Sequence, residues 1–165
     1  MPLKDTIKED MKSAFKAGDQ AARSTLSMLL SVIQNRELEK RAKLMKSGGA
    51  TEGDVAAKSE LTDEEVVDAI SSEVKKRRES VATYEQGGRP ELAQGERAEA
   101  ELLSRYLPEQ MSEEDVKQLI AKAVSETGAS AAGDIGKVMG RIAPAIKGRF
   151  DGARANALVK EALGA

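Results

Sequence analysis

The sequence contains no cysteine, no histidine and no tryptophan. Without cysteine the chain has no disulfides and no thiolate metal ligands, a composition typical of the reducing cytoplasm. Without histidine it lacks the commonest general base near neutral pH and the commonest ligand of transition metals. Nucleophile–base pairs built on cysteine or histidine are therefore excluded. We expect no catalytic residue, no metal and no cofactor.

Aromatic side chains and long apolar runs are also scarce. Only two Phe and two Tyr occur in 165 residues, so any core has to be aliphatic. No apolar run approaches the roughly 20 residues that span a bilayer, and the start of the chain lacks the apolar segment of a signal peptide. The net charge of −2 predicts no global attraction to DNA or to anionic membranes. These features predict a cytoplasmic protein.

Helical periodicity runs along the chain, and no segment alternates with the period of two that is typical of a strand. In the first part, the pattern predicts a short helix from Leu3 to a C-cap at Gly18 and longer helices over about 21–46, 62–86 and 90–107. The first half of the second helix is apolar nearly all round, which predicts that neighbouring helices bury it on two sides.

The segment 47–60 separates the two longest of these helices. It contains three glycines and no apolar period, so we predict a mobile loop there. The helices on either side of this loop are expected to form an antiparallel hairpin, with the first helix of the chain packed on it.

The last third of the chain predicts a small three-helix domain. A capped helix begins at Ser112, a short helix covers about 134–142 before Pro144 breaks the chain, and Asp151 caps the last helix. The fold class is therefore expected to be all-α, with an N-terminal helical domain, made of a helical hairpin and flanking helices, and a C-terminal domain. The predicted domains are 1–108 and 109–165.

Several motifs resemble catalytic or ligand-binding sequences, and each has a simpler structural interpretation. A Ser-Lys site at Lys12 and Ser13 is disfavoured because adjacent side chains diverge on a helix. The acidic clusters 63–65 and 113–115 are conceivable cation ligands, but the helix dipole also favours acids in a first turn. The glycines of 133–140 do not fit the spacing of a phosphate loop. We expect them to let backbones approach closely.

The basic residues are unevenly distributed along the chain. The run Lys75–Arg78 wraps around a helix, so it is either a solvated face or a contact for RNA or a protein. Residues 129–165 carry a net charge of +3, while residues 1–128 carry −5. A basic surface between two helices is a candidate phosphate-contact patch, although ordinary surface cations fit the same counts. The candidate nucleic-acid-binding residues are Lys137, Arg141, Lys147, Arg149 and Arg154.

Five motifs occur in the order found in one known family. They are LSMLLSVIQNRELEKR at 26–41, LTDEEVVDAISSEVKKRRES at 61–80, YLPEQMSEED at 106–115, GKVMG at 136–140 and KGR at 147–149. On these motifs the chain resembles the YqeY-like proteins over essentially its whole length. The resemblance implies an all-helical N-terminal domain before a small helical domain similar to the tail of GatB. GatB is the tRNA-binding subunit of the amidotransferase that converts misacylated Glu-tRNA(Gln) or Asp-tRNA(Asn).

The pattern of the GatB tail can be followed through the C-terminal part of the chain. It corresponds to Gly136, Lys137, Val138, Met139, Gly140, Lys147, Gly148, Asp151, Gly152 and Asn156.

The chain departs from the family pattern in three ways. Phe150 replaces a residue that is usually small, so its ring either stacks on a base or fills the domain. The segment 47–60 is longer than usual, and the large catalytic region of GatB is missing.

The resemblance implies a function linked to tRNA amidation. We expect a tRNA-binding or amidotransferase-associated accessory protein without its own catalytic site. Its partners would be tRNA and an amidotransferase or an aminoacyl-tRNA synthetase, with no DNA and no membrane. One alternative is a protein-interaction module with no RNA role, which docks through an acidic N-terminal hairpin. Another is a carbon–nitrogen ligase with glutamine as amido-N-donor, an activity that the residues present do not support in isolation.

Overall fold

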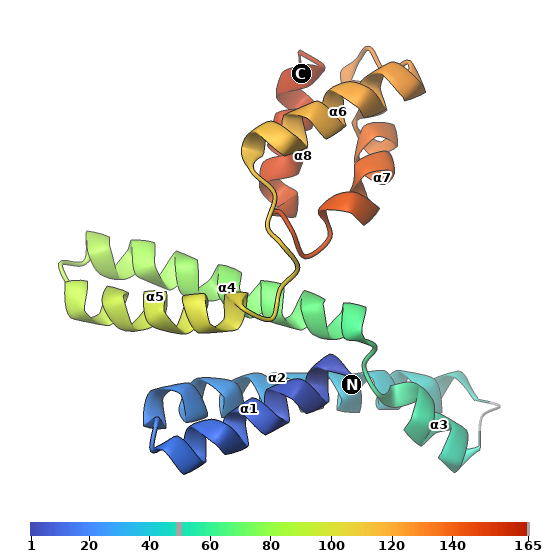
Figure 1. The fold of residues 1–165 in the computed structure, drawn as a ribbon. Helices are drawn as coiled ribbons and strands as arrows, with labels where there is room; N and C mark the ends of the chain where they lie inside the picture. The colour runs from blue at the N-terminus through green and yellow to red at the C-terminus, as the bar shows by residue number, and fades with distance from the viewer. Residues whose placement is uncertain (49–50, 165) are drawn as a thin grey trace. The chain divides into compact units, whose positions relative to one another are not determined.

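A computed structural model describes residues 1–48 and 51–164. Within these ranges every regular element is helical and no strand is present, so the predicted all-α class is confirmed (Figure 1). The elements are α1 Leu3–Ala17, α2 Gln20–Ser47, α3 Glu52–Ser59, α4 Asp63–Gln86, α5 Pro90–Ser104, α6 Glu113–Thr127, the 3-10 turn η1 Ala132–Asp134, α7 Ile135–Ile146 and α8 Gly152–Ala162.

The helices group into two compact units, which we call unit 1 and unit 2. Unit 1 covers residues 1–106 with α1 to α5, and unit 2 covers residues 107–165 with α6 to α8. This division falls two residues before the boundary expected from the sequence. Each unit is described below by itself.

Unit 1 is built from two hairpins of sequence neighbours, α1 with α2 and α4 with α5 (Figure 1). Gly18 turns the chain between α1 and α2 with a left-handed φ of 73°, and the Asp19 side chain then caps α2 by accepting from the Ala22 amide at 2.9 Å. As expected, α1 packs on α2 and α2 contacts α4, but α2 and α4 are not the most extensive pair. Because α4 and α5 are joined by only a short turn, α4 packs most extensively against α5.

The predicted loop over 47–60 is also wrong, because residues 52–59 form α3. Thr51 caps this helix by accepting from the Asp54 amide at 3.2 Å, and the helix packs on α2 and buries Val55. A helix with a single large apolar residue leaves no period in the sequence, so pattern analysis missed it. The predicted loop residues 49–50 lie outside the described ranges.

The core of unit 1 is aliphatic, as the composition predicts. Its fully buried large side chains are Ile7, Leu26, Leu29, Ile33, Val66, Ile70 and Leu103. Burial of α2 is confined to one side, however. Met28 is 54% exposed, so the expectation that the first half of this helix is buried on two sides is wrong.

Unit 2 packs α6, α7 and α8 around a second aliphatic core. Its buried residues include Val116, Ile120, Val138, Ile142, Ile146, Leu158 and Val159. The predicted break at Pro144 does not occur, and α7 continues to Ile146. Ile142 and Ile146 lie one helical turn apart and both face the core. Their burial offsets the single hydrogen bond that a proline removes in a last turn.

Candidate nucleic-acid interface

The five predicted basic residues all lie in unit 2, on three successive segments. Lys137 and Arg141 lie on α7, Lys147 and Arg149 lie in the turn after it, and Arg154 lies in the first turn of α8. The side chains of Lys137 and Arg141 are 67% and 62% exposed. A negatively charged ligand in solution can therefore reach them.

Two of these cations pair with carboxylates near the C-terminal end of α6 and the start of α7. Arg141 donates from Nε and Nη2 to Glu126 Oε2 at 3.0 and 2.8 Å. Lys137 Nζ lies 2.7 Å from Asp134 Oδ1. The hydrogen bond from Arg141 lowers the pKa of Glu126, and the hydrogen bond from Lys137 lowers the pKa of Asp134. Both carboxylates are thus held charged, and they partly neutralise the cations.

Arg154 is held at the opposite end of α6. It donates to both carboxylate oxygens of Glu113, at 2.7 Å from Nη2 and 3.1 Å from Nε, and lies 3.4 Å from Glu161. This fork-shaped contact lowers the pKa of Glu113 and raises that of Arg154. The contacts with Glu113 anchor Arg154 to the first turn of α6. Arg149 donates from Nε to the backbone carbonyl of Glu109 at 2.9 Å.

The structure does not bring the five residues into one patch. Glu113 and Glu126, which hold Arg154 and Arg141, are thirteen residues apart on α6, and that spacing corresponds to about 20 Å. Lys137 and Arg141 therefore lie near one end of this helix, and Arg149 and Arg154 lie near the other. Unit 2 as a whole contains eight Lys and Arg and eight Asp and Glu. The charge of +3 calculated for 129–165 is cancelled by the charge of −3 on residues 107–128.

One face of α7 carries almost no side-chain bulk. Gly136 and Gly140 lie one turn apart and are exposed, and a Cβ atom added to either would meet nothing within 4 Å. The expectation that these glycines allow close backbone approach is therefore not met inside unit 2. Lys137 and Arg141 directly follow these glycines along α7 and thus lie beside the bare face. Phe150 packs against the core of unit 2, which favours the second of its two predicted roles.

The basic run Lys75–Arg78 on α4 is divided by burial. Arg77 is 6% exposed and donates to Glu73 at 3.0 Å and to Glu99 on α5 at 2.9 Å. Burial tends to raise the pKa of Glu73, but its hydrogen bonds with Lys76 and Arg77 outweigh this effect and lower it. Arg77 joins two helices of the core, so it is unavailable to a ligand.

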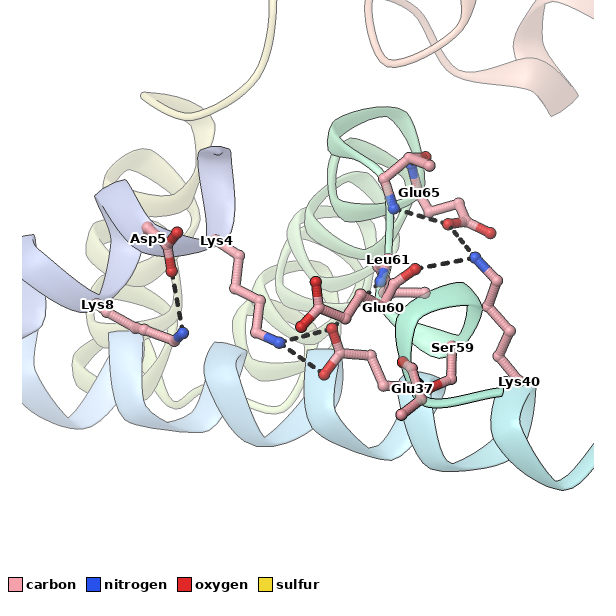
Figure 2. A network of polar contacts seen from close by, with 11 residues as sticks. Lys4, Asp5, Lys8, Glu37, Lys40, Ser59, Glu60, Leu61 and Glu65 are labelled. Carbon is pink, nitrogen blue, oxygen red and sulfur yellow. Dashed lines mark hydrogen bonds and ion pairs between the residues drawn. The ribbon is translucent and has the colours of Figure 1, made fainter. Parts of the chain in front are cut away.

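A second polar network lies where α4 begins, and sequence reasoning missed it (Figure 2). Lys4 on α1 contacts both carboxylate oxygens of Glu37 at 2.6 and 2.7 Å, and Glu37 also accepts from the Leu61 amide at 3.2 Å. Lys40 donates to Glu65 at 2.7 Å and to the Glu60 carbonyl at 3.0 Å. These bonds fix the start of α4 against α1 and α2. Only the capping pair of Thr62 with Glu65 has a local sequence signal.

The described residues contain no group of three or more carboxylates placed to hold a metal ion. Nor does any helix within the described ranges have the length and apolarity to cross a membrane. The predicted acidic clusters instead start helices. Glu65 and Asp115 close the capping boxes of α4 and α6 with Thr62 and Ser112.

These features define an all-helical protein of two compact units, in which Lys137, Arg141 and Arg154 of unit 2 form surface ion pairs. The chain belongs to the YqeY family, because the family model described as "Yqey-like protein" matches residues 4–163.

Curated relatives are fungal proteins named "Altered inheritance of mitochondria protein 41, mitochondrial". The protein from Eremothecium gossypii is 31% identical over 101 residues, which cover 61% of this chain and 46% of the relative. The protein from Candida glabrata is 28% identical over 114 residues, which cover 68% and 54%. The protein from Clavispora lusitaniae is 26% identical over 126 residues, which cover 75% and 64%. The chain thus spans about half the length of the first two relatives.

Proposed function

We propose that this protein is a tRNA-binding accessory of a GatB-type amidotransferase, and that α7 contacts the tRNA backbone. The observation that carries the proposal is the exposed face of α7, where two glycines without neighbouring side chains lie beside Lys137 and Arg141. Membership of the YqeY family, whose C-terminal domain resembles the GatB tail, supports the choice of tRNA.

The chemistry of this face suits a phosphate backbone. Folded RNA is recognised largely by its shape and by its phosphates and 2′-hydroxyls. Gly136 and Gly140 let a sugar-phosphate chain approach the helix closely, and Lys137 and Arg141 supply the opposite charge. Their carboxylate partners are no barrier, because exposed ion pairs contribute only about 0–1 kcal/mol. A phosphate can therefore take the place of Glu126 or Asp134.

The remaining parts of the proposal concern the other basic residues, the chemistry and the location. Lys147, Arg149 and Arg154 form a second basic group that contacts a neighbouring stretch of the same RNA. The amide-transfer chemistry belongs to the partner, an amidotransferase or an aminoacyl-tRNA synthetase. We propose a cytoplasmic location, whereas the fungal relatives are named as mitochondrial proteins.

Binding of tRNA to the full chain, measured from about 50 to 300 mM salt, tests this function. Two phosphates neutralised by α7 give a slope of log K against log salt of about −1.4 to −1.8, and contributions from the second group make it steeper. The double variant Lys137→Glu, Arg141→Glu should weaken binding and flatten the slope.

The matched control is Lys12→Glu, Lys16→Glu on the exposed surface of α1, which changes the net charge equally. The proposal fails if the control variant weakens binding as much as the α7 variant. It also fails if the unmodified chain does not bind tRNA at the lowest salt concentration.

A further inference from the structure

Half of the exposed large apolar side chains in the described residues lie on one helix. Six such side chains are exposed, and three of them are Met28, Leu38 and Met45 of α2, at 54%, 56% and 63%. Ser31, Asn35 and Ala42 are also exposed and complete a spacing of three and four residues from Met28 to Met45. This spacing is the heptad repeat that lines the contact between two helices in a coiled coil. We call these six residues the α2 seam.

The α2 seam faces away from the core of unit 1. At 3.6 residues per turn, its mean direction lies roughly 180° from that of the buried Leu26, Leu29 and Ile33. The contacts of α2 with other helices use different positions, as in the ion pairs of Glu37 with Lys4 and of Lys40 with Glu65. The seam is about 26 Å long, and no described residue of unit 1 covers it.

We infer that the α2 seam binds the α2 seam of a second copy of this chain, with the two helices antiparallel. A two-fold axis between Asn35 and Leu38 brings every seam position opposite another one. Met28 then lies opposite Met45, Ser31 opposite Ala42, and Asn35 opposite Leu38. Large side chains meet large ones at both ends and small ones meet small ones, so the seam is complementary to itself. An interface of this kind closes at two copies.

The charges beside the seam select the antiparallel arrangement. In a parallel pair, Arg41 of one helix would lie beside Lys46 of the other, twice per dimer, and like charges at these flanking positions disfavour pairing. In the antiparallel pair the nearest flanking neighbour of Arg41 is Gln34, which accepts a hydrogen bond from a guanidinium group.

The association is expected to be weak. A contact of about 26 Å by about 10 Å is smaller than the roughly 600 Å² that each partner buries in a small stable interface. Asn35 reduces the affinity further, because it buries an amide opposite Leu38. We expect a dissociation constant on the order of 10–100 μM.

Sedimentation equilibrium of the full chain from about 10 μM to 1 mM tests the dimer. Leu38→Glu should weaken association at least tenfold, and Asn35→Leu should strengthen it at least tenfold. The control is Leu92→Glu, the same change at an exposed leucine of α5 outside the seam, which should leave association unchanged. Circular dichroism establishes that each variant folds. A chain that remains monomeric at 1 mM, or one that Leu92→Glu disrupts as strongly as Leu38→Glu, overturns the proposal.

Cysteine crosslinking tests the orientation without background, since the chain has no cysteine of its own. An oxidised mixture of the Met28→Cys and Met45→Cys variants should form the mixed disulfide in large excess over either symmetric one. Efficient crosslinking of Met28→Cys to itself would instead show a parallel pair and overturn the antiparallel arrangement. This experiment involves no RNA, so its failure is independent of the tRNA proposal.

Discussion

Unit 1 contains a buried ion pair, whereas the ion pairs that join the helices of unit 2 are exposed. In unit 1, Arg77 joins α4 to α5 through Glu73 and Glu99 with its side chain only 8% exposed, although other pairs of this unit, such as Arg97 with Glu85, lie at the surface. In unit 2, Arg141 and Arg154 also join helices, but their side chains are 62% and 44% exposed. Charge removed from water is costly to unpair, whereas exposed charge exchanges partners readily. Arg77 is therefore structural, whereas Arg141 and Arg154 are available to a ligand.

The largest expected effect is on the buried pair of unit 1. Arg77→Ala leaves the buried Glu73 with Lys76 as a remaining partner and removes the link to Glu99 on α5, which should cost up to about 3 kcal/mol of the free energy of unfolding. Urea unfolding followed by tyrosine fluorescence measures it, since Tyr84 and Tyr106 both lie in unit 1. Arg154→Ala should cost less than about 1 kcal/mol, measured by amide hydrogen exchange in unit 2. Equal costs for the two arginines would abolish the distinction between the units.

The pH dependence of unit 1 follows from Glu73. Its pKa is lowered from the ordinary 4.5 in the folded state, so its stabilising effect is complete above that value and is lost as the pH falls below it. Thermal melts between pH 7 and pH 3 should show this loss. Glu73→Gln should lower the stability at pH 7 and reduce the fall in melting temperature between pH 7 and pH 3. If this fall is unchanged by the substitution, other carboxylates cause the loss of stability.

The two capping boxes provide a case in which the units should behave alike. Thr62 caps α4 and Ser112 caps α6 with the same pair of hydrogen bonds. Replacing either with alanine should cost about 1 kcal/mol, measured as faster hydrogen exchange in the first turn of the helix concerned. A much larger cost for Thr62→Ala would show that the polar network around Glu65 amplifies the cap.

The smallest expected effect on stability is that of Glu126→Gln in unit 2. This substitution removes a surface partner of Arg141 and should change the free energy of unfolding by less than about 0.5 kcal/mol. If α7 binds tRNA as proposed, the same variant should bind tRNA about two- to tenfold more tightly, because a competing carboxylate is gone. Unchanged binding would mean that Arg141 does not exchange Glu126 for phosphate.

Features that depend on residues close together in the chain were predicted better than features that depend on distant residues. Caps at Asp19, Thr62 and Ser112 and the apolar periods located seven of the eight helices, because the residues that determine a helix are close together in the chain. The eighth, α3, depends on one buried valine packed against α2 and leaves no period. The extensive packing of α4 on α5, beside its contact with α2, was missed because periodicity identifies a buried face without identifying what covers it.

The candidate site could be predicted only in part. Sequence reasoning selected the exposed cations of α7 and α8, but it could not show that Glu126 and Glu113 pair with Arg141 and Arg154. Those partners are 15 and 41 residues away in the chain. It also treated Lys75–Arg78 as one run, whereas packing of α4 on α5 buries Arg77 and leaves its neighbours at the surface.

The pairing of each helix with its neighbour in the chain has a consequence for how the protein folds. The α1–α2 and α4–α5 hairpins and the packing of α6, α7 and α8 all form between segments that are close in sequence. The contact order is accordingly low, and chains of this kind collapse and fold in about microseconds to milliseconds. Each hairpin can assemble as soon as its second helix leaves the ribosome. Only the closure of one hairpin on the other in unit 1 has to wait for residues synthesised much later.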